Sequence, residues 1–337
     1  MNHLYCGVDI AKETAVFCLI NSDGTPLGKA ASFKNTSQGF HVAEKWMRKL
    51  SKAFKPFDIH VCMEATGVYF LSLAKFFHGQ TGMVVSVVNP AQVKHFSDAN
   101  LQRTKTDEVD ACAIARFTKA MSPRPWTPPA RHEEEMINLL RHIDTLKEIQ
   151  QAELNRLKDL VIVGDSTAGV QKSIMEHVAF IEDQIKDLDG KLKGVVKSVP
   201  ETSESVKLLC SIPGIAENTA HKLVAEMGNV SRYNSVKQLV ASAGLAPAEK
   251  RSGKSVRGKS SINKRGSRRL RKSLYMPAVS AIRYNPVVKE LYVRLLAAGK
   301  PKMLAVVACM RKLLHIVYGV LKNKQRFDAT LGDATST

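Results

Sequence analysis

Residues 102–117, QRTKTDEVDACAIARF, decide how the first part of this chain folds. The stretch begins basic and polar and then becomes apolar at helical spacing, through Val109, Ala113, Ile114 and Phe117. We therefore predict a helix with Thr106 as its N-cap, because a threonine hydroxyl can accept a hydrogen bond from the first turn. The acidic side chains that follow Thr106 suit the positive end of a helix dipole.

Two carboxylates in this predicted helix, Asp107 and Asp110, are three residues apart and therefore lie on one face. Acidic residues are common at the start of a helix, so this pattern alone leaves a structural and a functional role equally open. The upstream sequence favours the functional role, because two further carboxylates stand there at the ends of predicted strands.

The upstream sequence predicts a mixed α/β sheet with helices packed on it. Short apolar runs at 4–10, 14–20, 26–33, 58–63 and 83–88 are predicted strands. Amphipathic runs at 37–50 and 68–77 are predicted helices. Three strands come first, and an alternation of strands and helices follows them.

Asp9 lies near the end of the first predicted strand, and Glu64 terminates the fourth. Functional side chains of α/β sheets gather at the carboxyl ends of strands, so we expect one converged set of Asp9, Glu64, Asp107 and Asp110. Such carboxylates repel one another unless divalent cations lie between them, and hard oxygen ligands suit Mg²⁺ or Mn²⁺. Two such ions clamp the attacking and leaving oxygens of a phosphodiester. Each acid taken alone could equally be a cap or a surface charge.

The chain of 337 residues is strongly basic, with a formal net charge of +19. This surplus favours a polyanionic partner, nucleic acid before an acidic membrane surface. The sequence shows no apolar run of about eighteen residues and no signal-peptide pattern, so we expect a cytoplasmic protein without a membrane span. Its six cysteines form no CxxC pair, which predicts reduced thiols rather than a zinc site.

A proline-rich stretch at 121–130 is typical of an extended linker that ends the first domain. Apolar residues at alternating three- and four-residue steps then predict a two-helix, coiled-coil-like connector around a loop at 164–169. Pairing within one chain and pairing between subunits both fit this pattern, and polar Gln150 and Glu153 at seam positions hint at a specified register. The predicted domains are 1–125, 126–203 and 204–328, with a disordered tail at 329–337.

Three short motifs of the first domain resemble a known family. Residues 7–12 (GVDIAK), 64–67 (EATG) and 105–111 (KTDEVDA) are similar to the signatures of a RuvC-like DEDD domain. That domain occurs in the bridge-RNA-guided insertion-sequence transposases and in the related Piv-type DNA invertases. The resemblance implies an RNase H-like fold. It also implies a catalytic, Mg²⁺- or Mn²⁺-binding set made of Asp9, Glu64, Asp107 and Asp110.

Residues 206–228 predict two helices around a turn at Pro213 and Gly214. This part resembles a helix–hairpin–helix element, whose backbone N–H groups bind a DNA phosphate without reading sequence. An ordinary helical hairpin is the alternative. The segments 270–284 and 287–321 are predicted to be helical and to pack the core of the second domain.

Residues 250–272, the basic segment, contain no acidic side chain and interleave basic residues with glycine and serine. Its first half is predicted to be too flexible for a regular element. A phosphate backbone should neutralise this segment, because a merely solvated loop of such charge density would repel itself. The predicted nucleic-acid-binding residues are Lys105, Pro213, Gly214, Lys250, Arg251, Lys254, Arg257, Lys259, Lys264, Arg265, Arg268 and Arg269.

Ser252 lies in the run PAEKRSG at 247–253, which matches a P-x-x-x-x-S-G pattern in the transposase domain of the same family. The resemblance implies that Ser252 is the nucleophile that becomes linked covalently to DNA. Without it, Ser255, Ser260 and Ser261 would be comparable candidates. A hydroxyl nucleophile needs activation by a base, a metal or a dense cationic field.

The resemblance therefore implies a site-specific DNA recombinase, a transposase of an insertion sequence that cuts and rejoins DNA through a serine link. The resemblance, which spans the chain from Gly7 to about Phe327, implies a non-coding bridge RNA that pairs with donor and target DNA. It also implies a homo-oligomer, a dimer or tetramer, with composite sites. A hydrolytic DEDD nuclease of the Holliday-junction resolvase type is one alternative. A non-catalytic nucleic-acid-binding protein is the other.

Overall fold

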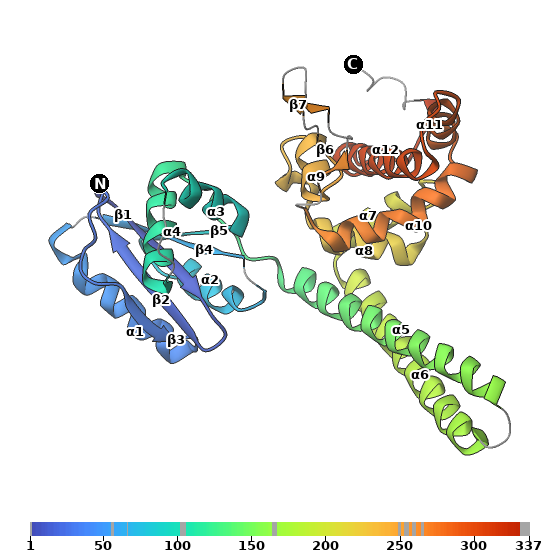
Figure 1. Ribbon diagram of the computed structural model, residues 1–337, viewed down its shortest axis with the longest axis horizontal. Coiled ribbons are helices and arrows are strands. Elements are labelled where there is room, and N and C mark those ends of the chain that lie inside the picture. Colours follow the sequence, from blue (N-terminus) through green and yellow to red (C-terminus); the bar gives the residue numbers. More distant parts are fainter. Residues whose placement is uncertain are drawn as a thin grey trace. The chain divides into compact units, whose positions relative to one another are not determined.

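The computed structural model describes residues 2–54, 57–65, 67–101, 106–163, 167–248, 251–252, 256–257, 261–263 and 266–330. The chain divides into two compact units, Met1–Pro128 and Pro129–Thr337 (Figure 1). The division falls inside the proline-rich stretch that was predicted to be a linker. The finer division at 203 and 204 remains a prediction, and most of the predicted tail lies outside the described residues.

A five-stranded mixed sheet with the order β3-β2-β1-β4-β5 forms the centre of the first unit. β1 pairs antiparallel with β2 and parallel with β4, and β4 pairs parallel with β5. The carboxyl ends of β1, β4 and β5 therefore lie at one edge, as the prediction of a mixed sheet requires. The strands are β1 (Asn2–Ile10), β2 (Thr14–Ile20), β3 (Ala31–Lys34), β4 (Phe57–Glu64) and β5 (Met83–Val88).

The third strand is shorter than the predicted run at 26–33. Pro26 makes only an isolated bridge with Ile20, and β3 begins at Ala31. Proline has no N–H to donate to a ladder, and Gly28 adopts a φ of +110°, so a continuous strand cannot form there.

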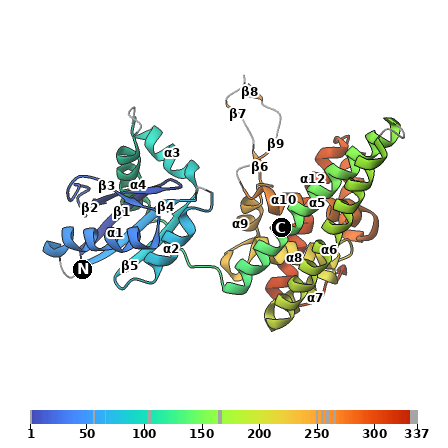
Figure 2. The ribbon, with the colours of Figure 1, turned by 90° about the horizontal axis from the view of Figure 1, so that it is seen from below.

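Helices cover both faces of the sheet (Figure 2). α1 (Ser37–Leu50) and α2 (Phe70–His78) pack on one face, and the short 3₁₀ helix η1 (Lys52–Phe54) follows α1. α3 (Pro90–Ala99) and α4 (Asp107–Met121) pack on the other face. α3 was not predicted from the sequence. It begins where the Asn89 side chain accepts a hydrogen bond from the N–H of Ala91 at 2.9 Å and Pro90 occupies the first turn.

Two long helices, α5 (Arg131–Val163) and α6 (Ala168–Ser198), pack on each other as a hairpin within one chain. The polar residues that interrupt the seam bond across it. The Gln150 amide donates to Glu182 at 2.9 Å, and Glu153 lies 3.4 Å from a ring nitrogen of His177. Both polar residues that the sequence singled out thus contact the partner helix of the hairpin.

The rest of the second unit consists of helices around one hydrophobic core. α12 is long and apolar enough to cross a membrane, yet it carries fully buried Cys309, Leu313 and Val317 into this core. The predicted run at 287–321 is broken at 298–301, where Pro301 follows Gly299. The elements are α7 (Pro200–Cys210), α8 (Glu217–Met227), η3 (Val230–Arg232), α9 (Val236–Ser242), α10 (Arg268–Tyr284), α11 (Pro286–Ala297) and α12 (Lys302–Asn323).

Four two-residue strands between α9 and α10 form what we call the serine arm (Figure 2). They form two antiparallel pairs, β6 with β9 and β7 with β8. Regular pairing here corrects the expectation that this part is too flexible for a regular element. The arm strands are β6 (Pro247–Ala248), β7 (Arg251–Ser252), β8 (Val256–Arg257) and β9 (Ser261–Ile262).

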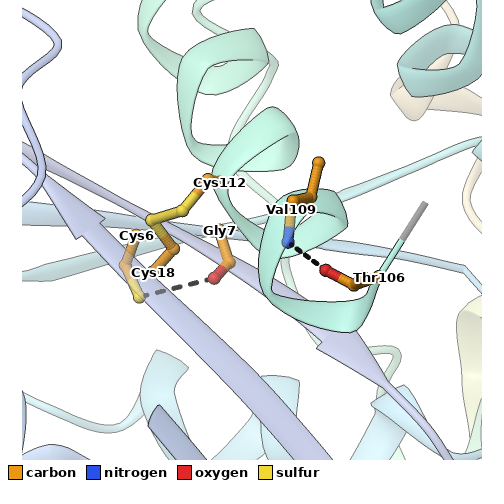
Figure 3. Close-up of a disulfide and its surroundings, with 6 residues drawn as sticks. All are labelled: Cys6, Gly7, Cys18, Thr106, Val109 and Cys112. Atoms are coloured by element: carbon orange, nitrogen blue, oxygen red, sulfur yellow. Dashed lines mark hydrogen bonds between the residues drawn. A yellow bond between two sulfur atoms is a disulfide. The ribbon is translucent and has the colours of Figure 1, made fainter. Parts of the chain in front are cut away.

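The expectation of six reduced cysteines is wrong for one pair, because Cys18 of β2 and Cys112 of α4 form a disulfide (Figure 3). The two residues are 94 positions apart, and the packing of α4 on β2 brings their Cα atoms to 5.0 Å, a distance that a disulfide requires. Cys6, Cys62, Cys210 and Cys309 are free. Burial raises the pKa of the Cys62 and Cys309 thiols to about 11, so both stay protonated near neutral pH.

Candidate active site

Asp9 and Glu64 stand side by side and face α4. Side chains alternate along a strand, and Val8 of β1 and Met63 of β4 both pack into the core under α1 and α2. The next residues, Asp9 and Glu64, therefore point to the opposite face, where α4 lies. Val8 pairs with Met63 in the parallel ladder. The residues that follow this pair, Asp9 and Glu64, therefore lie next to each other on neighbouring strands, at the carboxyl edge of the sheet. Both are half-buried.

α4 approaches β1 closely at Gly7. A Cβ at residue 7 would overlap the carbonyl oxygen of Ala111 and the backbone nitrogen of Ala115, so only glycine fits there. Gly7 precedes Asp9 by two residues on the same face of the strand, and Ala111 directly follows Asp110. This backbone contact therefore brings the first turn of α4 to the part of the sheet that carries Asp9.

The start of α4 is fixed as the sequence predicted. The Thr106 hydroxyl oxygen accepts a hydrogen bond from the N–H of Val109 at 3.3 Å, which confirms the N-cap (Figure 3). Asp107 is exposed and Asp110 is half-buried in the first turn. The Cys18–Cys112 disulfide then ties the following turn to β2.

A residue that the sequence analysis missed, Asn35, joins the loops that follow the two carboxylate-bearing strands. Its side-chain amide donates to the carbonyl oxygen of Ala11, after β1, at 3.0 Å. The same amide donates to the carbonyl oxygen of Tyr69, after β4, at 3.4 Å. Its backbone N–H donates to the carbonyl oxygen of Glu13 at 2.8 Å. A polar residue directly after a strand was the only sequence signal for this role.

The four carboxylates suit a hard divalent ion, because they supply only oxygen ligands. Asp9 and Glu64 are brought together by the strand register, and Asp107 and Asp110 approach the same face from α4. Across the described part of the chain, however, no three His, Cys, Asp or Glu side chains stand close enough to hold one ion. The residues fit such an ion by chemistry and by face, without forming a closed cluster.

Ser252 lies in the second unit, on β7 of the serine arm. Its backbone pairs with Val256, and the preceding Arg251 pairs with Arg257. The strand register therefore sets two predicted phosphate-binding arginines opposite each other, next to the serine.

The remaining predicted nucleic-acid contacts are only partly covered by the structure. Arg268 and Arg269 are exposed and begin α10, whose first turn is capped by the Ser267 side chain at 3.1 Å from the N–H of Leu270. Outside the described residues lie Lys105, Lys250, Lys254, Lys259, Lys264 and Arg265.

The turn between α7 and α8 contains Pro213 and Gly214, as predicted. Gly214 has a φ of +102°, and a Cβ there would lie 2.8 Å from the backbone nitrogen of Ala281 in α10. The glycine is therefore required for the turn and for its packing on α10. This packing explains the glycine without a nucleic-acid contact, and its predicted role at a DNA phosphate stays a prediction.

Comparison with known proteins identifies the family. Residues 206–293 match the "Transposase IS116/IS110/IS902 family", and residues 6–162 match the DEDD domain of transposases of the IS110 type. The pilin gene-inverting proteins of Moraxella bovis and Moraxella lacunata are each 32% identical over 330 residues, which cover 97% of this chain and 98% of theirs. The chain belongs to the IS116/IS110/IS902 transposase family. Another relative, the transposase for insertion sequence element IS1111A of Coxiella burnetii, is 23% identical over 95% of this chain and 90% of its own length.

Membership of the IS116/IS110/IS902 family makes the chain a DNA transposase or recombinase enzyme. The alternative of a non-catalytic nucleic-acid-binding protein is therefore wrong. The DEDD domain, together with the five-stranded mixed sheet, suggests an RNase H-like fold and the use of a divalent metal.

Proposed function

We propose that this transposase is a site-specific DNA recombinase of an insertion sequence, with Asp9, Glu64, Asp107 and Asp110 as its metal-binding carboxylates. The observation that carries this proposal is the strand register that sets Asp9 beside Glu64 on the face under α4. Bound Mg²⁺ or Mn²⁺ supplies positive charge to the phosphate under attack. The contact of Gly7 with α4 holds the spacing between the strand carboxylates and the helix carboxylates.

We propose further that Ser252 is the nucleophile. Its Oγ forms a bond to phosphorus while the bond from phosphorus to one strand end breaks. The proton of Oγ passes to a base, and the departing oxygen takes up a proton. The resulting phosphoserine retains the energy of the phosphodiester, so the free strand end can attack it and reseal the DNA. The basic residues that neighbour Ser252 in the sequence, Arg251, Lys254 and Arg257, support this role, because cationic groups stabilise the developing charge.

Ser252→Ala should abolish both strand cleavage and rejoining while DNA binding persists. Ser261→Ala, on β9 of the same arm, is the matched control and should remain active. Mass spectrometry of a denatured reaction should locate the nucleotide on Ser252 in the wild-type protein. An active reaction without any protein–DNA adduct would replace this proposal by the hydrolytic DEDD nuclease. An adduct on Ser255 would correct the residue.

A non-coding bridge RNA is the proposed guide, because the resemblance to bridge-RNA-guided transposases implies one. The net charge of +19 exceeds what the basic segment alone contributes, which supports a further polyanionic partner. Purified, RNA-free protein should then recombine DNA at specific sites only after the RNA transcribed beside the insertion sequence is added. Specific recombination without RNA would remove the guide and leave the recombinase assignment in place.

The same proposal assigns DNA phosphates to the basic segment and to the α7–α8 turn as a helix–hairpin–helix element. The arrangement of α7, turn and α8 supports it. We propose that the protein acts in the cytoplasm as a homo-oligomer, a dimer or a tetramer. Light scattering of the protein with and without DNA tests the oligomer, and a monomer under both conditions would remove it.

A further inference from the structure

One face of α5 presents a charged row to the neighbouring helices α8 and α10. Arg141, Asp144 and Glu148 follow one another at steps of three and four residues, so they share one face of α5. The Asp144 carboxylate binds Lys222 of α8 at 2.6 Å, and the Glu148 carboxylate binds Lys272 of α10 at 2.8 Å. Both lysines are therefore neutralised by acids of α5.

Arg141 differs from its two neighbours in this row. Within the described part of the chain, its Nε atom is buried and has no hydrogen-bond partner. Burial and then the charge of Arg269, at the start of α10, lower the pKa of Arg141, whereas the charge of Glu226 on α8 raises it. The contact of Lys272 with Glu148 places the first turn of α10, which carries Arg269, along this row of α5. A buried N–H without a partner costs free energy.

The charges around Arg141 do not balance. The charge of Glu226 acts on Arg141, and its carboxylate also accepts a hydrogen bond from Ser267, just before Arg268 and Arg269, at 3.4 Å. Arg268 acts on Glu148, which already binds Lys272. The cluster thus holds more positive than negative side chains: Arg141, Lys222, Arg268, Arg269 and Lys272 against Asp144, Glu148 and Glu226.

We propose that Arg141 and Arg269 together bind one phosphodiester group of a nucleic-acid backbone. A phosphate supplies the missing negative charge, and its oxygens suit the forked N–H donors of a guanidinium. α10 is also the helical end of the acid-free segment 250–272, so the site continues a stretch that is already cationic. The inference rests on the proposed function. It adds Arg141, a residue of the long hairpin 128 positions before Arg269, to the proposed nucleic-acid contact surface.

Arg141→Gln in the full chain tests the site. Anisotropy titrations with duplex DNA and with duplex RNA of the same sequence, at several salt concentrations, give log K against log salt. The variant should bind about tenfold more weakly, because hydrogen bonds to charged groups carry that much. Its slope should fall by roughly 0.9, the value for one duplex phosphate contact. Loss on one probe only would assign the phosphate to that nucleic acid.

Arg156→Gln is the matched control, because Arg156 lies on the same helix and lies 3.9 Å from Glu153 in an ion pair. It should keep the wild-type slope. Arg269→Gln should reproduce the loss, and the double variant should lose less than the sum of the two. A wild-type slope for Arg141→Gln on both probes would overturn the proposal, as would an equal loss in Arg156→Gln.

Thermal unfolding separates a lost contact from a misfolded protein. Arg141→Gln should unfold at the wild-type temperature or above, because it removes a repulsion from Arg269. Arg141→Lys keeps the charge without the fork and should retain part of the slope. Suppose that Arg141→Gln keeps the wild-type salt slope and that the wild-type protein forms an adduct on Ser252. These two results together would reject this inference and leave the serine mechanism in place. A reduced slope without any adduct would reject only the serine mechanism.

Discussion

The carboxylate face of the first unit and the serine arm of the second are held in place by different means. Asp9 and Glu64 stand on long strands of a five-stranded sheet, beneath a helix in backbone contact with Gly7. Ser252 stands on a two-residue strand that pairs with another two-residue strand. Interior packing dictates the first position, whereas a few backbone hydrogen bonds hold the second. Substitutions near the carboxylates should therefore change stability and activity together, and those near Ser252 should change activity alone.

The largest expected effect comes from the carboxylates themselves. Asp9→Asn or Glu64→Gln removes a proposed metal ligand, worth several kcal/mol in the transition state, and should slow recombination roughly a thousandfold. Asp58→Asn, at the opposite end of β4, is the matched control and should keep the wild-type rate. Rates are measured on a plasmid carrying donor and target, and circular dichroism checks folding. A wild-type rate in both site variants would show that the face under α4 is not the active site.

An effect of at most similar size, on stability instead of rate, should follow reduction of the Cys18–Cys112 disulfide. The chain-entropy treatment assigns up to roughly 4–5 kcal/mol to closing a loop of this length. Both tryptophans, Trp46 and Trp126, belong to the first unit, so their fluorescence during urea unfolding reports on that unit. Dithiothreitol should lower the urea midpoint of this signal.

A Cys18→Ser and Cys112→Ser double variant provides the control for that experiment. Its urea midpoint should equal that of the reduced wild-type protein and should not change when dithiothreitol is added. Equal midpoints for the wild-type protein with and without reductant would mean that the disulfide does not stabilise the sheet. Cytoplasmic thiol systems keep most such cysteine pairs reduced. The disulfide therefore stabilises the protein only under conditions in which this pair stays oxidised.

The smallest effect should come from Asn35→Ala. The variant loses the hydrogen bonds to Ala11 and Tyr69, so the loops after β1 and β4 are no longer joined. We expect about 1–2 kcal/mol of lost stability, together with a higher Mg²⁺ requirement for recombination. Asn21→Ala removes three hydrogen bonds in the turn after β2 and is the control. An unchanged Mg²⁺ requirement in Asn35→Ala would leave Asn35 with a purely structural role.

The local rules of sequence reading located most of the first unit. Thr106 and the apolar spacing after it predicted α4, and the predicted strand ends placed Asp9 and Glu64 at the carboxyl edge of the sheet. Contacts between distant residues could not be predicted in this way. The Cys18–Cys112 pair and the amide bonds of Asn35 exist only because the sheet and α4 have already packed. Spacing in the sequence carries no trace of them.

In the second unit, the basic segment was recognised by its charge, but its strand pairing was not. Two-residue strands such as β7 have no periodicity to detect. The importance of Arg141 was also hidden, because a single arginine within a charged helix looks like ordinary solvated surface. The ion pairs that α8 and α10 form with Asp144 and Glu148 show that these acids do not balance the positive charge of Arg141.

The contact between Gly7 and α4 bears on how mutational tolerance should be read in this family. Gly7 and Asp9 sit two positions apart in one motif, and a scan that scores activity alone would find both intolerant. The reasons differ. Gly7 is needed because it lets the backbone of α4 lie against β1, whereas Asp9 is needed for its carboxylate. Protein abundance, scored beside activity, would separate them, since alanine at position 7 should deplete the protein and asparagine at position 9 should not. The motif thus carries two selective constraints, one on assembly and one on chemistry, only two positions apart.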